Sequence, residues 1–485
     1  MEKESAPTSL QGTLKLVVCG GGASAVLLLA ALRRRVTGTI DVTVVEPRDE
    51  LGLGVAYSTQ CPLHVLNTRA RNMSANDESD DFYDWLRTTH RRRPLNWTRN
   101  CFAPRKLYGE YLQSRLQEIR SAPDVRFHWV RSAVDSVVAC GDGWEVIPAK
   151  GVPLRADVVV LATGNEAPRG LAAGLPPHVR SFVVDDPWDA TARQALSPED
   201  PVLLVGTGLT AVDVVIELLH RGHTGPIYAT SRRGLLPRRH GPVHASPADG
   251  CGATLPTSLR DLVRHVRKMI ESDPRGSVWQ GFVNEMRSHA PTVWSRWSAR
   301  ERRQFLRHVR PFWDVHRHRI APPVYSRIHR AIERGQLKIL KARVVGIEAA
   351  PNAQAVTVRL QQAGNETHVQ VARAINCTGP ETDPRRASNT LLRSLLSDSL
   401  AQPDSLGLGL FVDQHSRVVA ANGSAHPTLF ALGPLTRGSR WEVTAVAEIR
   451  DQAVSVARRI ARDLAIGADR ESGLGQVGDF RQSLA

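Results

Sequence analysis

An apolar segment near the start of the chain, LKLVVCGGGASAVLLLAALRRRV at residues 14–36, constrains the fold more than any other stretch. It has two interpretations: an export signal, or a strand, a glycine turn and a helix that bind a nucleotide. Glycines interrupt the apolar run, and Arg33, Arg34 and Arg35 follow it, whereas a signal peptide carries its charge in front. The sequence therefore favours the glycine turn.

The first glycine turn matches the G-x-G-x-x-A pattern of dinucleotide-binding βαβ units, with Gly20, Gly22 and Ala25 in the three positions. The first glycine permits a tight turn, the second lets a pyrophosphate approach, and the small third residue lets the helix pack closely. Backbone amides at the helix N-terminus, including that of Ser24, are expected to hold the phosphates. The next strand ends in Glu46, whose carboxylate suits ribose hydroxyls.

The pattern returns in PVLLVGTGLTAVDVVIELLHRG at residues 201–222, with Gly206, Gly208 and Ala211 in the three positions. This repeat predicts a second dinucleotide site. Two sites of this kind in one chain indicate FAD at the first turn and a nicotinamide cofactor at the second turn.

The strand after the second turn lacks the acid and ends in Ser231, Arg232 and Arg233. An arginine at this position pairs with a 2′-phosphate that a carboxylate would repel, which favours NADPH over NADH. The alternative is that both arginines are solvated surface charges.

Charge and composition exclude several other classes. The 485-residue chain carries a formal net charge of +15, but its arginines are spread over the whole length and aromatic residues make up only 5%. No zinc finger, RRM signature or basic heptad region is present, so nucleic-acid binding is not expected. An anionic substrate or cofactor explains the positive field equally well.

The cysteines and the hydropathy pattern indicate a cytoplasmic protein. The six cysteines form no C-x-x-C pair, so neither a zinc or other metal site nor a dithiol redox centre is expected, and scattered thiols suit a reducing cytosol. No uninterrupted apolar stretch reaches the ~18 residues of a membrane helix.

Short segments after the first turn are expected to complete the cofactor site. Gly54 lies in a glycine-rich loop, and two strands end at Gly164 and Gly379, where the chain returns to a sheet. The strand-like segments VRFHWV, DSVVACG and GWEVIPA between residues 125 and 149 predict an antiparallel ribbon.

Taken together, these segments resemble the bacterial FAD-NAD(P)-binding proteins, whose layout is similar to that of flavin-containing monooxygenases and amine or amino-acid N-hydroxylases. The segments that carry the resemblance are GGGASA, GLGVAYST, LNTRARNMS, PRKLYGEYL, LATGN, GTGLTAVD, SRRGLLPR, HRHRIAP, INCTGP and GPLTRG with the following WEVTAVAEIRDQA. They extend over most of the chain.

The resemblance implies an α/β fold with two Rossmann-like dinucleotide-binding domains. The FAD domain would be discontinuous, comprising residues 1–195 and 376–485. The NADPH domain would comprise residues 196–375 and carry a helical insertion at about residues 240–335, a stretch rich in Arg, His and Trp.

The resemblance also implies roles for residues near the C-terminus. Gly433 matches the late glycine that brings the chain beneath the flavin, but Pro434 follows it where many relatives carry an Asp that holds the ribityl chain. Backbone amides near Thr444, at the start of the last helix, are expected to face the flavin pyrimidine ring instead and to favour its negative charge when reduced.

The resulting functional hypothesis is an NADPH-consuming monooxygenase that acts through a flavin hydroperoxide in a dry pocket, with N-hydroxylation of an amine or amino acid suggested by analogy. One alternative is a reductase or dehydrogenase that passes electrons to a partner without oxygenation, and a second is a non-catalytic FAD-binding scaffold. The expected partners are molecular oxygen and a small amine or carboxylate, without integral membrane association. An oligomer is possible.

Four residues are candidates for catalysis: His64, Asn67, Arg317 and Trp441. His64 and Asn67 lie in a predicted cofactor loop. Arg317, in the stretch WDVHRHRIAPP, suits a substrate carboxylate or a phosphate, or is a cation at a helix end. Trp441 either stacks near the flavin or packs in the core.

Overall fold

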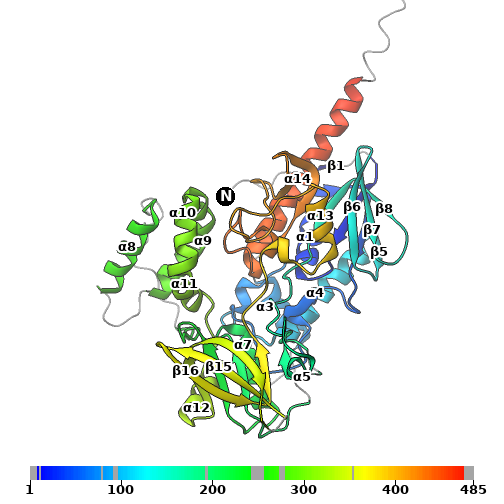
Figure 1. Cartoon of the computed structure of the whole chain (residues 1–485). Coiled ribbons are helices and arrows are strands. Elements are labelled where there is room, and N and C mark those ends of the chain that lie inside the picture. Colours follow the sequence, from blue (N-terminus) through cyan, green and yellow to red (C-terminus); the bar gives the residue numbers. More distant parts are fainter. Residues whose placement is uncertain are drawn as a thin grey trace, which may run out of the picture.

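The computed structural model describes residues 8–9, 12–77, 80–90, 97–189, 191, 195–241, 256–271, 279–351 and 354–474. Two mainly parallel sheets with flanking helices form the two halves of the molecule, and a group of helices lies at one side of them (Figure 1). The predicted α/β fold with two Rossmann-like units is confirmed.

The sheet of the first half contains strands from both ends of the chain. Its order is β18 (Arg417–Val419), β19 (Ala425–Ala431), β9 (Val158–Leu161), β2 (Leu14–Cys19), β4 (Ile40–Val45) and β5 (Val125–Val130). All neighbours are parallel except β18 and β19. Because β19 pairs with β9, the last quarter of the chain completes the sheet that the first residues begin, which makes this half discontinuous as predicted.

Helices cover this sheet because their apolar residues leave no exposed face. Helix α1 (Ala23–Arg33) is buried along most of its length and packs between the sheet, α4 (Arg105–Arg120) and α14 (Val446–Leu474). Five of the six residues of β2 are buried as well. This core fixes the position of the glycine turn that joins β2 to α1.

The expected antiparallel ribbon is only partly correct. β5 pairs in parallel with β4 and belongs to the main sheet. The ribbon is made by β6 (Val134–Cys140), β7 (Gly143–Pro148) and β8 (Leu154–Ala156). The difference arises because the hydrogen-bonding partner of β5 lies 85 residues earlier in the chain, at Ile40, which local alternation does not reveal.

The second half is built on a fully parallel sheet. Its order is β10 (Val183–Val184), β17 (Arg373–Asn376), β11 (Val202–Val205), β12 (Ile227–Ser231) and β13 (Leu337–Lys341). Since β10 pairs with β17, the domain boundary predicted at residue 195 is too late. An antiparallel sheet of β14 (Arg343–Ala349), β15 (Val356–Gln362) and β16 (Asn365–Val371) lies beside it.

Helices α7 (Leu209–His220) and α12 (Pro322–Glu333) pack in the core of the second half. Val324, Ile328 and Ala331 of α12 contribute to that core. The helical insertion therefore ends before α12, rather than at residue 335 as predicted.

The insertion consists of α8 (Leu259–Glu271), α9 (Trp279–Arg296), α10 (Ala299–Gln304), the π-helical η3 (Phe305–Val309) and α11 (Arg310–Arg317). These helices lie on the left in Figure 1, and their small hydrophobic core also includes Leu408 and Trp441 of the first half. Ser298 and Glu301 form a reciprocal capping box that starts α10. Residues 242–255 and 272–278, which the predicted insertion also includes, lie outside the described residues.

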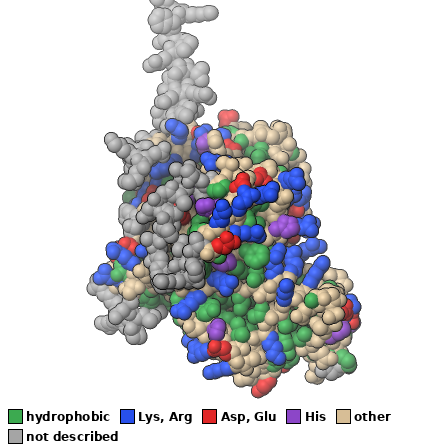
Figure 2. All heavy atoms as spheres, turned by 90° about the vertical axis from the view of Figure 1, so that its left-hand side faces the viewer, with side chains coloured by type: hydrophobic (Ala, Val, Ile, Leu, Met, Phe, Trp, Pro, Cys, Tyr) green, Lys and Arg blue, Asp and Glu red, His purple; other side chains and the backbone are tan. Residues whose placement is uncertain are grey.

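Short elements complete the chain. They are β1 (Thr8–Ser9), β3 (Val36–Thr37), α2 (Gly54–Tyr57), η1 (Ala70–Asn72), α3 (Asp81–Thr89), α5 (Pro177–Arg180), η4 (Pro384–Arg386), α13 (Thr390–Ser397) and η5 (Gly433–Thr436). Lys and Arg side chains are spread over the face that carries the insertion (Figure 2). Within the described part of the chain, no helix has the length and apolarity that a bilayer crossing requires.

Candidate functional site

The first glycine of the first turn leaves no space for a side chain. Gly20 has a φ of +108°, and a Cβ there would lie 2.4 Å from the carbonyl oxygen of Ala162. A Cβ on Gly22 would lie 3.6 Å from the Cα of Gly54, so the two glycines expose their backbones to each other. Helix α1 begins at this point without a side-chain cap. Its first amides therefore remain available to a phosphate.

Glu46 lies directly behind this turn and is buried, with 5% of its surface exposed. One carboxylate oxygen accepts the backbone N–H of Gly21 at 2.8 Å, and the other accepts that of Arg48 at 3.1 Å. These bonds hold the carboxylate at the carboxyl end of β4, where a ribose would lie.

The late glycine also reaches the first turn. A Cβ on Gly433, which has a φ of +69°, would lie 3.1 Å from the hydroxyl oxygen of Ser24. The amide of Gly433 donates to the side chain of Gln452 on α14 at 2.8 Å. The end of β19 therefore lies against the first turn of α1. Gly164, at the end of β9, has a φ of +78° and open space around it.

The second glycine turn repeats this geometry. Gly206 has a φ of +126°, and a Cβ there would lie 2.2 Å from the carbonyl oxygen of Cys377. Gly208 starts α7 without a side-chain cap, and Ala211 is buried under the helix. Gly379, with a φ of +89°, faces the same space.

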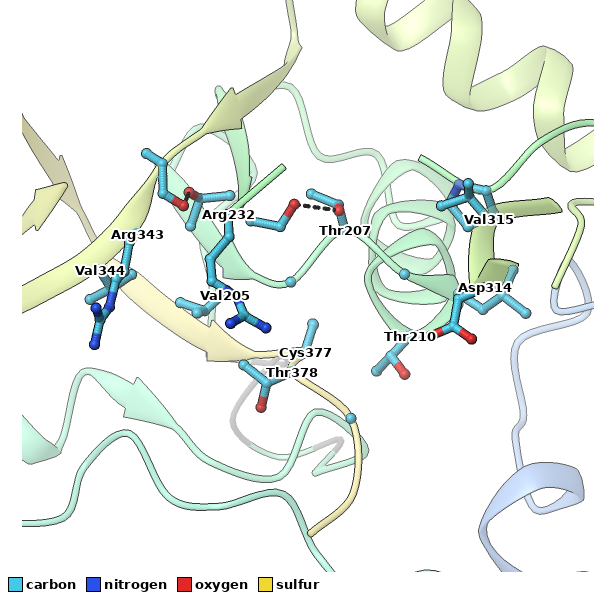
Figure 3. Close-up of a pocket in the computed structure, with 18 of the residues that line it drawn as sticks. Val205, Thr207, Thr210, Arg232, Asp314, Val315, Arg343, Val344, Cys377 and Thr378 are labelled. Atoms are coloured by element: carbon cyan, nitrogen blue, oxygen red, sulfur yellow. Dashed lines mark hydrogen bonds between the residues drawn. The ribbon is translucent and has the colours of Figure 1, made fainter. Parts of the chain in front are cut away.

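A cavity of about 570 Å³, here called the coenzyme cavity, opens at the second turn. Its lining includes the turn itself and the ends of β11, β12 and β17, together with Arg232 and Arg343. These two arginines lie on one side of the cavity and Asp314 on the opposite side (Figure 3). Neither Arg232 nor Arg343 has an ion-pair partner among the residues that the structure describes.

The predicted pair of arginines separates into two different environments. Arg232 lines the coenzyme cavity, whereas the guanidinium of Arg233 lies 4.9 Å from the ring centre of Phe312 and is not part of the lining. Arg343 at the start of β14 takes the second position instead. The sequence did not reveal Arg343, because it follows the turn by more than a hundred residues.

His64 is a structural link between the halves and not an exposed catalytic group, which corrects the prediction. Its ring is 1% exposed. Nε2 donates to the carbonyl oxygen of Asp213 on α7 at 2.9 Å, and Nδ1 lies 2.7 Å from the hydroxyl of Thr59. The carboxylate of Asp213 pairs with Arg105 at 2.7 Å. Both ring nitrogens of His64 are therefore already used.

Trp441 is a core residue, which is the second of its two predicted interpretations, and this corrects its place among the catalytic candidates. The indole is 3% exposed and stacks on Trp294 of the insertion, with ring centres 4.7 Å apart. Phe305 contacts it edge-on, and Arg437 lies over its ring. Trp441 thereby joins the insertion to the first half.

Glu442 accepts hydrogen bonds from both Arg317 and Thr444. Arg317 Nε donates to the Glu442 carboxylate at 2.9 Å, and both side chains are buried. Glu442 has a φ of +78°, an uncommon value for this residue type. The amide of Thr444 donates to the carbonyl oxygen of Glu442 at 2.6 Å, so the predicted flavin contact through this amide is not supported. The amides of the first turn of α14, which begins at Val446, lack acceptors within the helix.

Asn67 lines a second cavity of about 310 Å³. Its carbonyl oxygen accepts the Nε2 proton of His240 at 2.9 Å, since a carbonyl cannot donate. Desolvation, with neighbouring arginines, lowers the pKa of His240 to about 4. The remaining residues of this cavity are polar or basic and are considered below.

The described residues contain no group of His, Cys, Asp and Glu that would hold a metal ion. Five of the six cysteines lie in this part of the chain, and no disulfide joins any two of them. Burial raises the pKa of Cys19 to about 12, which keeps this thiol protonated.

Comparisons with known proteins agree with this arrangement. Residues 17–166 match the family model described as FAD-NAD(P)-binding, which includes the first glycine turn and Glu46. No curated protein sequence matches the chain. The family resemblance predicted from the motifs is therefore supported for the first third of the chain.

Solved structures match almost the whole chain. An ornithine N-hydroxylase from Kutzneria sp. 744 is similar with a TM-score of 0.66 and 16% identity over 93% of this chain and 100% of that one. A cadaverine monooxygenase from Erwinia amylovora has a TM-score of 0.59 and 14% identity over 93% and 94%. The bacillithiol disulfide reductase of Bacillus cereus has a TM-score of 0.54 and 13% identity over 93% and 100%. At this level of identity, these structures share their fold with this chain.

Proposed function

We propose that this protein is an oxidoreductase that binds FAD at the first glycine turn and NADPH at the second, and that it acts as a monooxygenase. The observation that carries the proposal is the pair of glycine turns, each closed against the carbonyl of a neighbouring strand. The first half of the molecule would bind FAD and the second half NADPH.

The residues of the first half fit a flavin dinucleotide. Gly20 and Gly22 leave the backbone free for a pyrophosphate, Glu46 faces the ribose position, and Gly433 lies against Ser24 where the chain would run beneath the flavin. When bound, the flavin takes electrons from the nicotinamide and delivers them to oxygen or another acceptor. The protein residues bind and orient it.

The coenzyme cavity fits NADPH for electrostatic reasons. Arg232 and Arg343 both line it, and neither guanidinium is neutralised by a carboxylate among the described residues. Arginine binds phosphate groups through paired N–H donors. A 2′-phosphate would supply the charge that balances these two residues.

The monooxygenase assignment is supported by two features. No C-x-x-C motif is present in the sequence, so the dithiol chemistry of thioredoxin-type reductases has no residues to act through. The helical insertion packs through Trp294 against Trp441 of the first half, and such a covering helix group would exclude water from the reacting atoms. The Kutzneria and Erwinia neighbours make N-hydroxylation the first reaction to test.

A reductase that passes electrons to a partner protein is the second candidate, since the same fold also occurs in a disulfide reductase. The free cysteines suit a reducing cytoplasm in either case.

The test is the stoichiometry of NADPH-driven oxygen consumption by the FAD-loaded protein with a panel of amines and amino acids. A monooxygenase consumes one NADPH, one proton and one O₂ for each molecule of substrate, and forms one hydroxylated product, one NADP⁺ and one water. Formation of hydrogen peroxide alone with every compound, together with rapid reduction of an added electron acceptor, would favour the reductase instead.

A further inference from the structure

The second cavity, of about 310 Å³, is unusually basic for its size, and we call it the basic pocket. It lies between the loop 67–72 of the first half, helix α9 of the insertion and the end of α11. Its lining residues are Asn67, Thr68, Arg69, Arg71, Asn72, His240, Gln280, Gly281, Asn284, Arg287, Arg317 and Arg319. Five of these are arginines, and none is acidic.

Only two of the arginines are neutralised. Arg317 pairs with Glu442 at 2.9 Å, and Arg287 forms a bidentate pair with Glu448, one of its two bonds being 2.6 Å long. Arg69, Arg71 and Arg319 have no carboxylate partner within the described ranges. Five guanidinium groups and two carboxylates leave a formal charge of 5 − 2 = +3 around the cavity.

Arg319 is the most informative of these residues. Its side chain is 6% exposed, yet it contacts only neutral groups, namely Gln280 at 2.8 Å, Asn284 and the ring of Trp279, whose centre lies 5.8 Å from the guanidinium carbon. Its buried Nε–H has no hydrogen-bond partner. A buried cation without a counter-charge is costly, and this cost lowers the pKa of Arg319 to about 10. An anion in the pocket would remove the cost.

The basic pocket adjoins the coenzyme cavity through one segment. Asp314, Val315 and His318 line the coenzyme cavity, whereas Arg317 and Arg319 line the basic pocket. Residues 314–319 therefore form a shared wall. A ligand in the basic pocket would lie next to the cofactor sites and separate from the phosphates of the coenzyme.

From this geometry we propose that the basic pocket is the substrate site and that the substrate is a small molecule with at least two acidic groups, carboxylate or phosphate. The proposal rests on the proposed function above, and it narrows the class of substrate. A net charge of +3 repels a diamine, so this chain would differ from its cadaverine-oxidising neighbour. The amide side chains of Asn67, Asn72 and Asn284 would bind the uncharged part of the molecule.

Calorimetric titration of the FAD-loaded protein tests the class of ligand, with succinate, citrate, inorganic phosphate and pyrophosphate as probes and acetate and cadaverine as controls. We expect at least one di- or polyanion to bind at least about tenfold more tightly than acetate, and cadaverine not to bind. The carboxylate and phosphate probes distinguish the two sources of charge. Tighter binding of cadaverine than of every anion would overturn the proposal.

Variants locate the site. Arg319→Gln should weaken the binding of the best probe about tenfold or more, because hydrogen bonds to charged groups contribute about 1.5–3 kcal/mol, while Arg319→Lys should retain part of it. Arg71→Gln tests the same site at an exposed position, in case Arg319→Gln does not fold. Arg300→Gln, on exposed α10, removes the same charge outside the pocket and should leave binding unchanged. Equal weakening by Arg71→Gln and Arg300→Gln would overturn the pocket assignment.

The rate of NADPH oxidation without substrate separates this proposal from the proposed function. If Arg71→Gln loses anion binding with normal FAD content, while Arg300→Gln retains both anion binding and this basal rate, the pocket proposal holds. If wild-type protein binds the anion in the pocket but NADPH never reduces its flavin, the proposed function fails while the anion site remains. If the anion competes with NADPH alone and Arg71→Gln has no effect, the pocket proposal fails.

Discussion

The two glycine turns of this molecule are nearly the same in shape. They differ in the residue at the position where the ribose of a dinucleotide would lie. In each turn a first glycine with positive φ lies against a carbonyl oxygen of the adjacent strand, Ala162 at the first turn and Cys377 at the second. Each turn starts a helix that has no side-chain cap. Both are therefore equipped for a diphosphate.

The difference appears in the strand that follows each turn, at the residue after the one whose carbonyl oxygen accepts the N–H of the first glycine. Val45 pairs with the strand of the first turn and is followed by Glu46, whereas Thr230 pairs with the strand of the second and is followed by Ser231. The carboxylate of Glu46 is held by the amide of Gly21. At the second turn, the hydroxyl of Thr207 donates to the hydroxyl of Ser231 at 2.9 Å. Ser231 therefore takes the position that the acidic Glu46 has at the first turn.

Under the proposed function, phosphate binding and sugar recognition are separate properties of this fold. Backbone geometry would provide the first, and the side chain at the strand end would provide the second. The glycine, serine and arginine substitutions that follow each alter either phosphate binding or sugar recognition in one half of the molecule.

The largest effect is expected from Gly20→Val and Gly206→Val, because the new Cβ would lie 2.4 Å and 2.2 Å from backbone carbonyl oxygens. Gly20→Val should abolish FAD retention. Gly206→Val should retain FAD but lose its reduction by NADPH. Visible absorbance of the purified variants and stopped-flow reduction measure both.

Gly222→Val is the matched control, since Gly222 also has a positive φ of +82° but open space around it. It should cost only backbone strain and leave both cofactors bound. Loss of FAD from Gly206→Val to the same extent as from Gly20→Val would contradict the separation of the two sites.

A smaller effect is expected when the residue at the ribose position of the second turn, Ser231, is exchanged. Ser231→Glu places a carboxylate where the structure has a hydroxyl, so a 2′-phosphate would be repelled. We expect the KM for NADPH to rise about 100-fold, equivalent to about 2.7 kcal/mol, with a much smaller change for NADH. An equal rise for both coenzymes in steady-state kinetics would show general damage to the turn instead.

Arg232→Ala and Arg343→Ala should each raise the KM for NADPH about tenfold, because each removes one of the two arginines that line the coenzyme cavity. Arg233→Ala is the control, since Arg233 lies over Phe312 outside the lining. The NADPH-to-NADH ratio of kcat/KM is the measurement. A larger loss in Arg233→Ala than in Arg232→Ala would contradict the placement of the phosphate.

These arginines show what the sequence reveals and what it does not. The glycine turns and Glu46 were predicted because each pattern is local, with strand, turn and helix within about thirty residues. Arg343 was missed because only the pairing of distant strands brings it to the cavity.

The same reason explains the errors in the candidate catalytic residues. For Trp441 the sequence left flavin stacking and core packing both open, and the folded insertion brings Trp294 against it in the core. The stretch WDVHRHRIAPP was predicted to bind an anionic group. Within it, however, Arg317 is neutralised by Glu442, and it is Arg319 that has no counter-charge. Neither the packing of Trp294 on Trp441 nor the pairing of Glu442 with Arg317 can be inferred from the local sequence.

The smallest expected effect concerns the pH dependence of the protein's stability. It depends on His240, which lies in the segment that follows β12. The folded pKa of His240 is about 4, below its ordinary value of 6.5. Between these values the unfolded chain binds a proton that the folded protein does not, so the free energy of unfolding should fall as the pH falls from 6.5 towards 4.

His240→Gln retains a donor for the carbonyl of Asn67 and removes this titration. The variant should lose roughly 1–3 kcal/mol less stability across that pH range than the wild-type protein. Urea unfolding at several pH values measures the slope. Identical slopes for the two proteins would show that His240 does not contribute.

The most direct test of the account is an anaerobic titration of the purified protein with NADPH, followed by visible absorbance. We expect a yellow protein, or one that becomes yellow on addition of FAD, whose flavin absorbance is bleached by about one equivalent of NADPH and much less readily by NADH. A colourless protein that does not take up FAD, or a bound flavin that NADPH leaves oxidised, would contradict it.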